Sequence, residues 1–229
     1  MTEEKFKEGQ VILIDKPLEW TSFQVVNKVR WLIKKTFGIK KIKVGHAGTL
    51  DPLATGLLII CTGKFTKKIN TFQAQEKEYT GVITLGATTP SYDLETEIDQ
   101  SFDISNITSE AIHNATKQFI GEIQQQPPVF SALKKDGKRL YEFARSGEKV
   151  DIPTRMVTIS EFEITKINLP HVHFRVACSK GTYIRTLAND FGKALNNGGH
   201  LSALRRTKIG AFSVEDAVDI ETFEASLQR

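Results

Sequence analysis

The feature that most constrains this chain is a run of twelve residues at positions 45–56, GHAGTLDPLATG, which holds a single carboxylate, Asp51. Glycine permits positive φ angles and close approach by another segment, and Pro52 disfavours helix at the residue before it. An apolar run at 57–60 follows directly. We therefore predict a rigid, irregular loop that holds one acid in place and is anchored by a buried strand. Such loops often carry catalytic groups; the alternative is that Asp51 only caps a turn.

The composition is that of a soluble globular protein, with 40% hydrophobic and 25% charged residues in 229. We expect a single catalytic domain over residues 1–229. Cys61 and Cys178 lie far apart in strand-like segments, which predicts buried free thiols in a reducing compartment. Neither a secretory signal nor an apolar run of the roughly 20 residues that span a bilayer is seen. The chain is therefore expected to be cytoplasmic, with no membrane partner.

Charge is distributed unevenly along the chain. Residues 79–116 hold six acids and residues 209–228 hold five, and neither stretch contains Lys or Arg. The basic residues gather in four clusters: 34, 35, 40, 41 and 43; 64, 67 and 68; 134, 135, 138 and 139; and 205, 206 and 208. This polarity suits a polyphosphate partner bound by charge attraction and counterion release. The alternative is a set of solvated charged faces.

Hydrophobic periodicity and capping residues predict an alternation of helices and strands. A helix capped by Thr21 or Ser22 is expected to end at Gly38. Further helices are predicted at 64–72, 108–120, 139–146, 182–195 and 215–227, and strands at 11–14, 42–44, 57–61, 79–87, 156–164, 172–178 and 201–212. Residues 122–138 lose periodicity and are predicted to form a flexible loop that closes over a ligand. The pattern indicates an α+β fold with a mixed, largely antiparallel sheet and flanking helices.

Several further segments accompany the 45–56 run: Lys16-Pro17, Lys77-Glu78-Tyr79, 127–134 (PPVFSALK), 137–142 (GKRLYE), 178–187 (CSKGTYIRTL) and 200–206 (HLSALRR). Together they resemble the motifs of the TruB-type pseudouridine synthases, in family order from about residue 10 to residue 217. The resemblance implies a pseudouridine synthase fold, with a long curved sheet and a central RNA-binding cleft. It also implies the activity, which is isomerisation of uridine 55 in the T-loop of tRNA.

The same resemblance implies three catalytic residues. Asp51 is expected to act on a flipped-out base, as a nucleophile at C1′ or on the uracil ring, or as a base at C2′; the sequence leaves these routes open. Arg185 is expected to pair with Asp51 and hold it ionised. Its alternative is a helix-surface arginine that meets Asp190 or solvent. Tyr79 is expected to stack on the uracil near C5, with an ordinary core aromatic as the alternative.

Further residues are expected to bind the substrate. Tyr183 and Leu204 would line the same pocket, although both residue types also fill cores. His46 would occupy the space vacated by the flipped base, and its alternative is a neutral histidine bonded within the turn. The remaining residues that are expected to bind the substrate are Lys16, Phe130 and Lys134. The inserted segment 122–147 is expected to clamp RNA, mobile without it and ordered with it.

Isomerisation requires neither energy input nor a metal or redox cofactor, so none is expected. The expected partner is tRNA, held through its T-arm by a monomer. The chain ends about 12 residues after Ala217, so we expect no C-terminal RNA-binding module of the PUA type that many family members carry. Two other functions remain open: a pseudouridine synthase that acts on another RNA, and an RNA-binding protein without catalysis.

Overall fold

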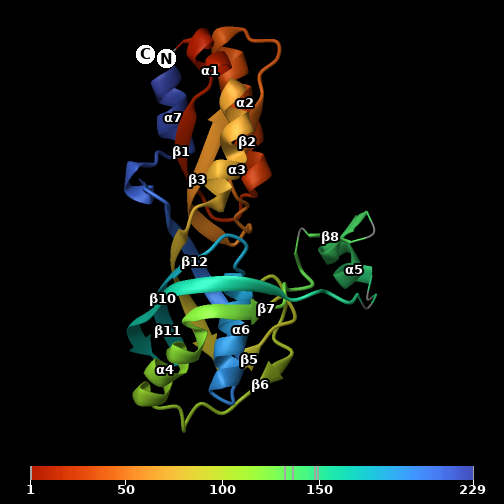
Figure 1. The fold of residues 1–229 in the computed structure, drawn as a ribbon, viewed down its shortest axis with the longest axis vertical. Helices are drawn as coiled ribbons and strands as arrows, with labels where there is room; N and C mark the ends of the chain where they lie inside the picture. The colour runs from red at the N-terminus through yellow and green to blue at the C-terminus, as the bar shows by residue number, and fades with distance from the viewer. Residues whose placement is uncertain (1, 132, 136, 147, 149, 229) are drawn as a thin grey trace. The chain divides into compact units, whose positions relative to one another are not determined.

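The computed structural model describes residues 2–131, 133–135, 137–146, 148 and 150–228 (Figure 1). The chain divides into two compact units: residues 1–79 with 204–229, and residues 80–203. The division falls inside two strands, β4 (Lys77–Leu85) and β12 (Gly199–Ile209), which therefore contribute to both units. The expectation of a single catalytic domain stays a prediction, because compactness does not test whether the units fold separately.

The first unit is built on the sheet order β1–β3–β12–β4, with β2 on β3 and β13 on β12. β1 (Val11–Lys16) is antiparallel to β3 (Ala54–Thr62), whereas β12 is parallel to β3. β2 (Val44–His46) pairs antiparallel with β3, and β13 (Phe212–Ser213) forms a hairpin with β12. β3 is almost continuously buried, as expected for a strand with neighbours on both sides.

Helix α2 (Ser22–Phe37) forms where its sequence predicts it. Thr21 and Gln24 make a reciprocal capping box, and Gly38 ends the helix in the left-handed conformation at φ 66°. Its apolar face joins a core with β1, β3 and α7 (Ile220–Leu227), and Figure 1 shows both helices beside these strands. The short α1 (Glu3–Glu8) was not predicted. The predicted helix at 64–72 divides into a 3-10 turn, η1 (Gly63–Lys68), and α3 (Ile69–Ala74); η3 (Val214–Asp216) precedes α7.

The second unit has the sheet order β12–β4–β11–β10–β7. β10 (Arg155–Asn168) pairs antiparallel with both β11 (His171–Cys178) and β7 (Gly121–Gln125). Helices α4 (Ser109–Thr116) and α6 (Ile184–Ala194) cover it, with η2 (Lys117–Phe119) after α4. Four rings interlock in its core with centroids 5.5–6.3 Å apart: Phe119, Phe162, Phe174 and Phe191. A small ribbon, β5 (Ala87–Thr88) with β6 (Gln100–Ser101), completes the unit.

The prediction of a loop over 122–138 is wrong at its start, where residues 121–125 form β7. This strand ends the order of the sheet and is mostly polar, so it lacks the apolar alternation that identifies half-buried strands. The rest of the inserted segment contains β8 (Lys134–Lys135), β9 (Lys138–Arg139) and α5 (Leu140–Ser146). Gly147, predicted to stop that helix, lies outside the described residues.

The α+β prediction is confirmed, with a mixed and mostly antiparallel sheet flanked by helices. Cys61 and Cys178 are buried free thiols, as predicted, and burial raises the pKa of Cys61 to about 11. Among the described residues, the helices are too short or too polar to cross a membrane.

Candidate active site

The loop that carries Asp51 connects β2 to β3 and is tied to its own strands. The Ala47 amide donates to the Ile59 carbonyl at 2.9 Å, and the Ala54 amide donates to the Asp51 carbonyl at 3.1 Å. Gly56 has a φ of 102°, and a Cβ there would lie 2.3 Å from the Arg206 carbonyl oxygen. Only glycine therefore lets β12 approach the end of the loop.

The first turn of α2 and the segment just before it hold the two neighbours of Asp51. The Leu50 amide donates to the Ser22 hydroxyl at 2.8 Å, and this hydroxyl donates to the Leu50 carbonyl at 3.1 Å. On the other side, the Glu19 amide donates to the Pro52 carbonyl at 2.8 Å. The backbone is thus fixed on either side of the acid. Ser22 was considered only as a helix cap from the sequence, where Thr21 in fact has that role.

Lys16 supports the loop from inside the unit. Its side chain is fully buried, and its ammonium group donates to the carbonyls of Pro17 at 2.8 Å, Trp20 at 2.6 Å and Pro52 at 3.4 Å. Burial lowers the pKa of Lys16 to about 8, against the attraction of the Asp51 carboxylate and with the repulsion of Arg206. Its predicted role in substrate binding stays a prediction.

Arg206 is a second cation beneath the loop. It is 1% exposed, and its guanidinium donates to the Leu57 carbonyl at 2.8 Å and to the Gly48 carbonyl at 3.2 Å. The basic cluster at 205, 206 and 208 was predicted to suit a polyphosphate partner, and the burial of Arg206 makes that interpretation wrong for this residue. Arg205 points the other way and binds Asp15 through two hydrogen bonds of 3.0 and 2.7 Å.

Three other predicted residues belong to the same unit. His46 lies in β2 at the entrance of the loop, and burial lowers its pKa, with a backbone bond to Gly48 opposing and the charge of Arg206 adding to the shift. Leu204 pairs in register with Ala54, directly after the loop. Tyr79 is buried in β4. Their predicted contacts with substrate stay predictions.

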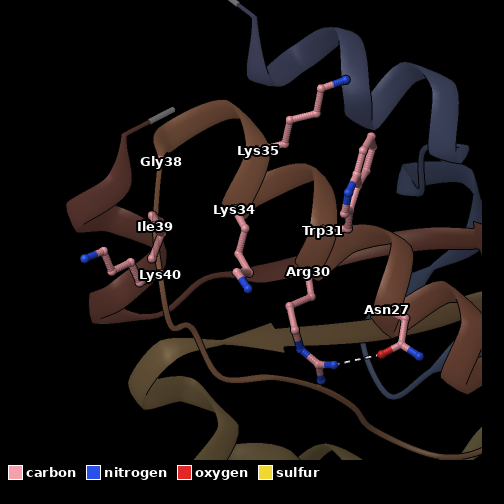
Figure 2. A pocket seen from close by; sticks show the side chains of 8 residues that line it. All are labelled: Asn27, Arg30, Trp31, Lys34, Lys35, Gly38, Ile39 and Lys40. Carbon is pink, nitrogen blue, oxygen red and sulfur yellow. Dashed lines mark hydrogen bonds between the residues drawn. The ribbon is translucent and has the colours of Figure 1, made fainter.

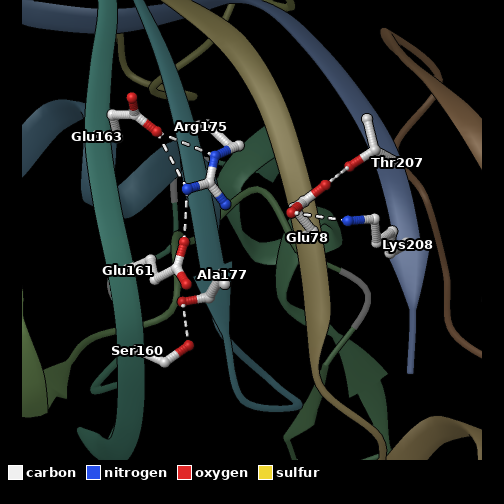
Figure 3. Close-up of polar contacts among 8 residues, drawn as sticks. All are labelled: Glu78, Ser160, Glu161, Glu163, Arg175, Ala177, Thr207 and Lys208. Carbon is white, nitrogen blue, oxygen red and sulfur yellow. Dashed lines mark hydrogen bonds and ion pairs between the residues drawn. The ribbon is translucent and has the colours of Figure 1, made fainter. Parts of the chain in front are cut away.

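The strand that carries Tyr79 is held by its neighbour Glu78. The Glu78 carboxylate accepts from the Thr207 hydroxyl at 2.7 Å and from the Lys208 ammonium group at 3.4 Å, both on β12 (Figure 3). Because adjacent strand residues point to opposite faces, this contact leaves Tyr79 on the other face of the sheet. In the second unit, Figure 3 shows Arg175 between Glu161 and Glu163, a ladder that links β11 to β10.

Arg185 lies in the second unit, at the start of α6, and is 4% exposed. Its Nε lies 3.5 Å from Oδ2 of the buried Asp93, and another guanidinium nitrogen donates to the Ser91 carbonyl at 3.3 Å. The alternative of a helix-surface arginine is wrong, since the side chain of Arg185 is buried. Asp190 lies 3.6 Å from Lys193. The predicted pairing of Arg185 with Asp51 stays a prediction. Asp93 was missed because its turn-rich, acidic segment looks like an exposed connection.

Tyr183 caps the same helix and is anchored by Gln125. The Tyr183 amide donates to the glutamine side chain at 2.7 Å, and that side chain donates back to the Tyr183 carbonyl at 3.0 Å. The Arg155 guanidinium lies 4.5 Å from the centroid of the Tyr183 ring. Phe130 is half-buried beyond β7, and the backbone of Lys134 lies in β8, with its side chain outside the described part. Whether these residues contact RNA stays a prediction.

The fold is shared with proteins of known structure. The chain superimposes on a chain of a Cbf5–Nop10–Gar1 complex with a TM-score of 0.72 and 31% identity, over 97% of this chain and 55% of that one. Residues 34–184 match the TruB family pseudouridylate synthase (N terminal domain), and residues 185–229 match the tRNA pseudouridylate synthase B C-terminal domain. These matches make the protein a pseudouridine synthase, an enzyme that isomerises uridine. The chain belongs to the TruB family, as its motifs predicted.

Two curated relatives match the chain over all or nearly all of its length. A protein of Flavobacterium johnsoniae named tRNA pseudouridine synthase B is 65% identical over 229 residues, covering all of both chains. A protein of the same name from Phocaeicola vulgatus is 57% identical over 218 residues, covering 95% of this chain and 93% of its own.

Proposed function

We propose that the protein converts uridine 55 in the T-loop of tRNA to pseudouridine, with Asp51 as the catalytic carboxylate. Relatives at 65% and 57% identity that carry the name tRNA pseudouridine synthase B support tRNA as the substrate. The observation that carries the role of Asp51 is its loop: Ser22 fixes Leu50 and Glu19 fixes Pro52, so the acid between them is held in one position. A turn-capping aspartate needs no such support.

The reaction requires one carboxylate and a protected site. The bond between C1′ and N1 breaks, the freed uracil turns, C1′ joins C5, and the proton on C5 leaves. Asp51 serves as a nucleophile at C1′ or on the ring, or as the base at C2′; all three need it ionised. The cation of Lys16 attracts this carboxylate. The proposal also keeps Arg185 as a partner of Asp51 and Tyr79 as the residue that stacks on the uracil.

A uridine stacked in a folded loop must be extruded before it reaches a recessed acid, at a cost of a few kcal/mol. We assign His46 to the space that the base vacates, and Tyr183 and Leu204 to the walls around the flipped nucleotide. Phe130 and Lys134 would hold the RNA outside. Support for RNA binding by this fold comes from a solved H/ACA RNP bound to a substrate RNA containing 2′-deoxyuridine, matched with a TM-score of 0.68 and 28% identity over 96% of this chain and 53% of that one.

The test is incubation with an unmodified tRNA transcript followed by chemical mapping of pseudouridine. Asp51→Asn is expected to bind tRNA and form no product, whereas Asp216→Asn, an exposed aspartate of the same unit, is expected to react normally. Product from Asp51→Asn would remove this residue from its role. Product at a different uridine would favour another RNA target, and binding without product in the wild type would favour a non-catalytic RNA-binding protein.

A further inference from the structure

Helix α2 from Asn27 onward, together with the segment after it, lines an open pocket of about 460 Å³ in the first unit (Figure 2). Eight residues line it: Asn27, Arg30, Trp31, Lys34, Lys35, Gly38, Ile39 and Lys40. Four of the eight are cations and none is an acid. Two more exposed lysines, Lys41 and Lys43, follow in the chain. A pocket with this lining favours a ligand with several negative charges.

Two of the side chains in the pocket are held in place. The Arg30 guanidinium donates to the Asn27 side chain at 2.7 Å and to the Val44 carbonyl at 2.9 Å. The ammonium group of Lys35 lies 4.7 Å from the centroid of the Trp31 ring, and that ring is 49% exposed. Arg30 and Lys35 therefore have less conformational entropy to lose when they bind an anion than freely moving surface cations do.

The end of α2 itself opposes an anion, because a helix C-terminus carries roughly half a negative charge. The Gly38 amide satisfies one of its carbonyls, that of Lys34. Four full positive charges around the pocket outweigh the remaining dipole. The net field in the pocket is therefore positive.

We propose that this pocket, formed by Arg30, Trp31, Lys34, Lys35 and Lys40, binds backbone phosphates of the RNA substrate at a distance from the target uridine. The proposal rests on the proposed function in taking tRNA as that RNA. An open pocket with dispersed cations matches a chain of phosphates better than one small anion, because each neutralised phosphate adds counterion release. Such contacts position an RNA without reading its sequence.

The length of α2 sets the distance between this pocket and the Asp51 loop. Ser22, in the first turn, bonds to Leu50, and Lys34 lies twelve residues further along the helix. At 1.5 Å per residue, Lys34 lies about 18 Å along the helix from that contact, whereas Asn27, the first residue of the lining, lies about 8 Å from it. Phosphates bound at the three lysines are therefore separated from the reacting uridine by other nucleotides. Loss of the pocket should therefore weaken RNA binding and leave the chemical step unchanged.

The experiment compares two triple variants that change net charge equally. Lys34→Glu/Lys35→Glu/Lys40→Glu reverses the pocket, and Lys5→Glu/Lys117→Glu/Lys166→Glu reverses three exposed lysines elsewhere. Binding of full-length tRNA is measured by fluorescence anisotropy between about 50 and 200 mM salt. The pocket variant is expected to bind tRNA about tenfold more weakly than the control variant does. The plot of its log K against log salt is expected to be shallower than that of the control variant, with the magnitude of the slope smaller by about two. Lys34→Arg/Lys35→Arg/Lys40→Arg should bind as the wild type does.

Single-turnover product formation at saturating tRNA should stay within about twofold of the wild type for all three variants, since no pocket residue touches the reacting base. Equal binding of tRNA by the pocket and control variants would overturn the proposal, whether both bind more weakly than the wild type or neither does. If neither binds more weakly, an acidic protein segment is favoured as the occupant of the pocket. Because binding is measured separately from product, a wild type that binds tRNA through the pocket and forms no pseudouridine would refute only the proposed function.

Discussion

Ser22 holds Leu50 by both of its backbone groups, accepting from the amide at 2.8 Å and donating to the carbonyl at 3.1 Å. One buried hydroxyl thus ties the first turn of α2 to the residue before Asp51. Both of these bonds go to the backbone of Leu50. Ser22 supports the loop and Asp51 is the proposed reacting group, so the support can be tested by variants that leave Asp51 unchanged.

Ser22→Ala is expected to leave the Leu50 amide and carbonyl buried without their partner. The free energy of unfolding should fall by about 1–3 kcal/mol, and product formation should slow by about 10- to 100-fold through misplacement of Asp51. KM for tRNA should change little. Chemical denaturation and single-turnover kinetics measure the two effects.

The matched control is Ser226→Ala, which removes a hydroxyl that donates to the Phe223 carbonyl within α7. It should cost less stability, since Ser226 is only partly buried, and should not slow the reaction. Equal rates for both alanine variants would mean that the Ser22 contact does not position Asp51.

Gly56→Ala tests the close approach of β12 to the end of the loop. The added Cβ would lie 2.3 Å from the Arg206 carbonyl oxygen, at a φ of 102°. We expect a loss of more than about 3 kcal/mol of unfolding free energy, or failure to fold, because backbone strain and a clash with backbone atoms add. Urea denaturation and soluble yield report the outcome.

Gly121→Ala separates these two causes. Gly121 has a similar φ of 96°, but a Cβ there meets nothing within 4 Å. This variant should show only the conformational strain, about 1–3 kcal/mol. If Gly56→Ala costs no more than Gly121→Ala, the clash with Arg206 does not constrain the loop.

The lowered pKa of Lys16 leads to a prediction about how stability depends on pH. Burial lowers its pKa to about 8 in the folded protein, against 10.5 for an ordinary lysine. Between these values the unfolded chain binds more protons, so the free energy of unfolding should rise as the pH increases from 8 to 10.5. Below pH 8 the lysine is charged in both states, and the folded state carries the full cost of burying that charge. The increase in the free energy of unfolding between pH 8 and pH 10.5 should therefore reach about 3 kcal/mol at most.

Lys16→Met isolates that contribution, because other groups also titrate in this range. The difference in unfolding free energy between the wild type and Lys16→Met should shift in favour of the wild type as the pH rises from 8 to 10.5. Urea denaturation at fixed pH values measures it. A difference that stays constant over this range would show that Lys16 titrates at an ordinary pKa.

Local sequence signals predicted the elements whose causes are local. Thr21 and Gly38 mark both ends of α2, and the glycines around Asp51 predict a fixed loop. β7 was missed because its segment is polar and obtains its hydrogen bonds from β10, whose paired residues lie 30 to 38 positions further along the chain. The pairing of strands that are distant in sequence has no such local signature.

The buried charges of the site could not be predicted for the same reason. Arg205 and Arg206 are adjacent and chemically identical, yet one binds Asp15 at the surface and the other lies under the loop. Alternation along a strand separates the two residues onto opposite faces, but which face is buried depends on the register with β3. Asp93 likewise acquires its role only when the fold brings it to Arg185.

The ion pair between Asp93 and Arg185 leads to the last prediction. Both side chains are almost fully buried, so removing one charge leaves the other in an environment of low polarity. Asp93→Asn and Arg185→Gln should each lower the free energy of unfolding by about 3–5 kcal/mol. The double variant should be less destabilised than the sum of the two by more than about 1 kcal/mol, because the second change removes the charge that the first one exposed. Urea denaturation of the four proteins gives this coupling energy, with Asp190→Asn as a control on the far side of α6 that should show no coupling to Arg185→Gln. Additive losses for Asp93 and Arg185 would mean that the 3.5 Å contact carries no energy of its own, and that the guanidinium is held by its other partners.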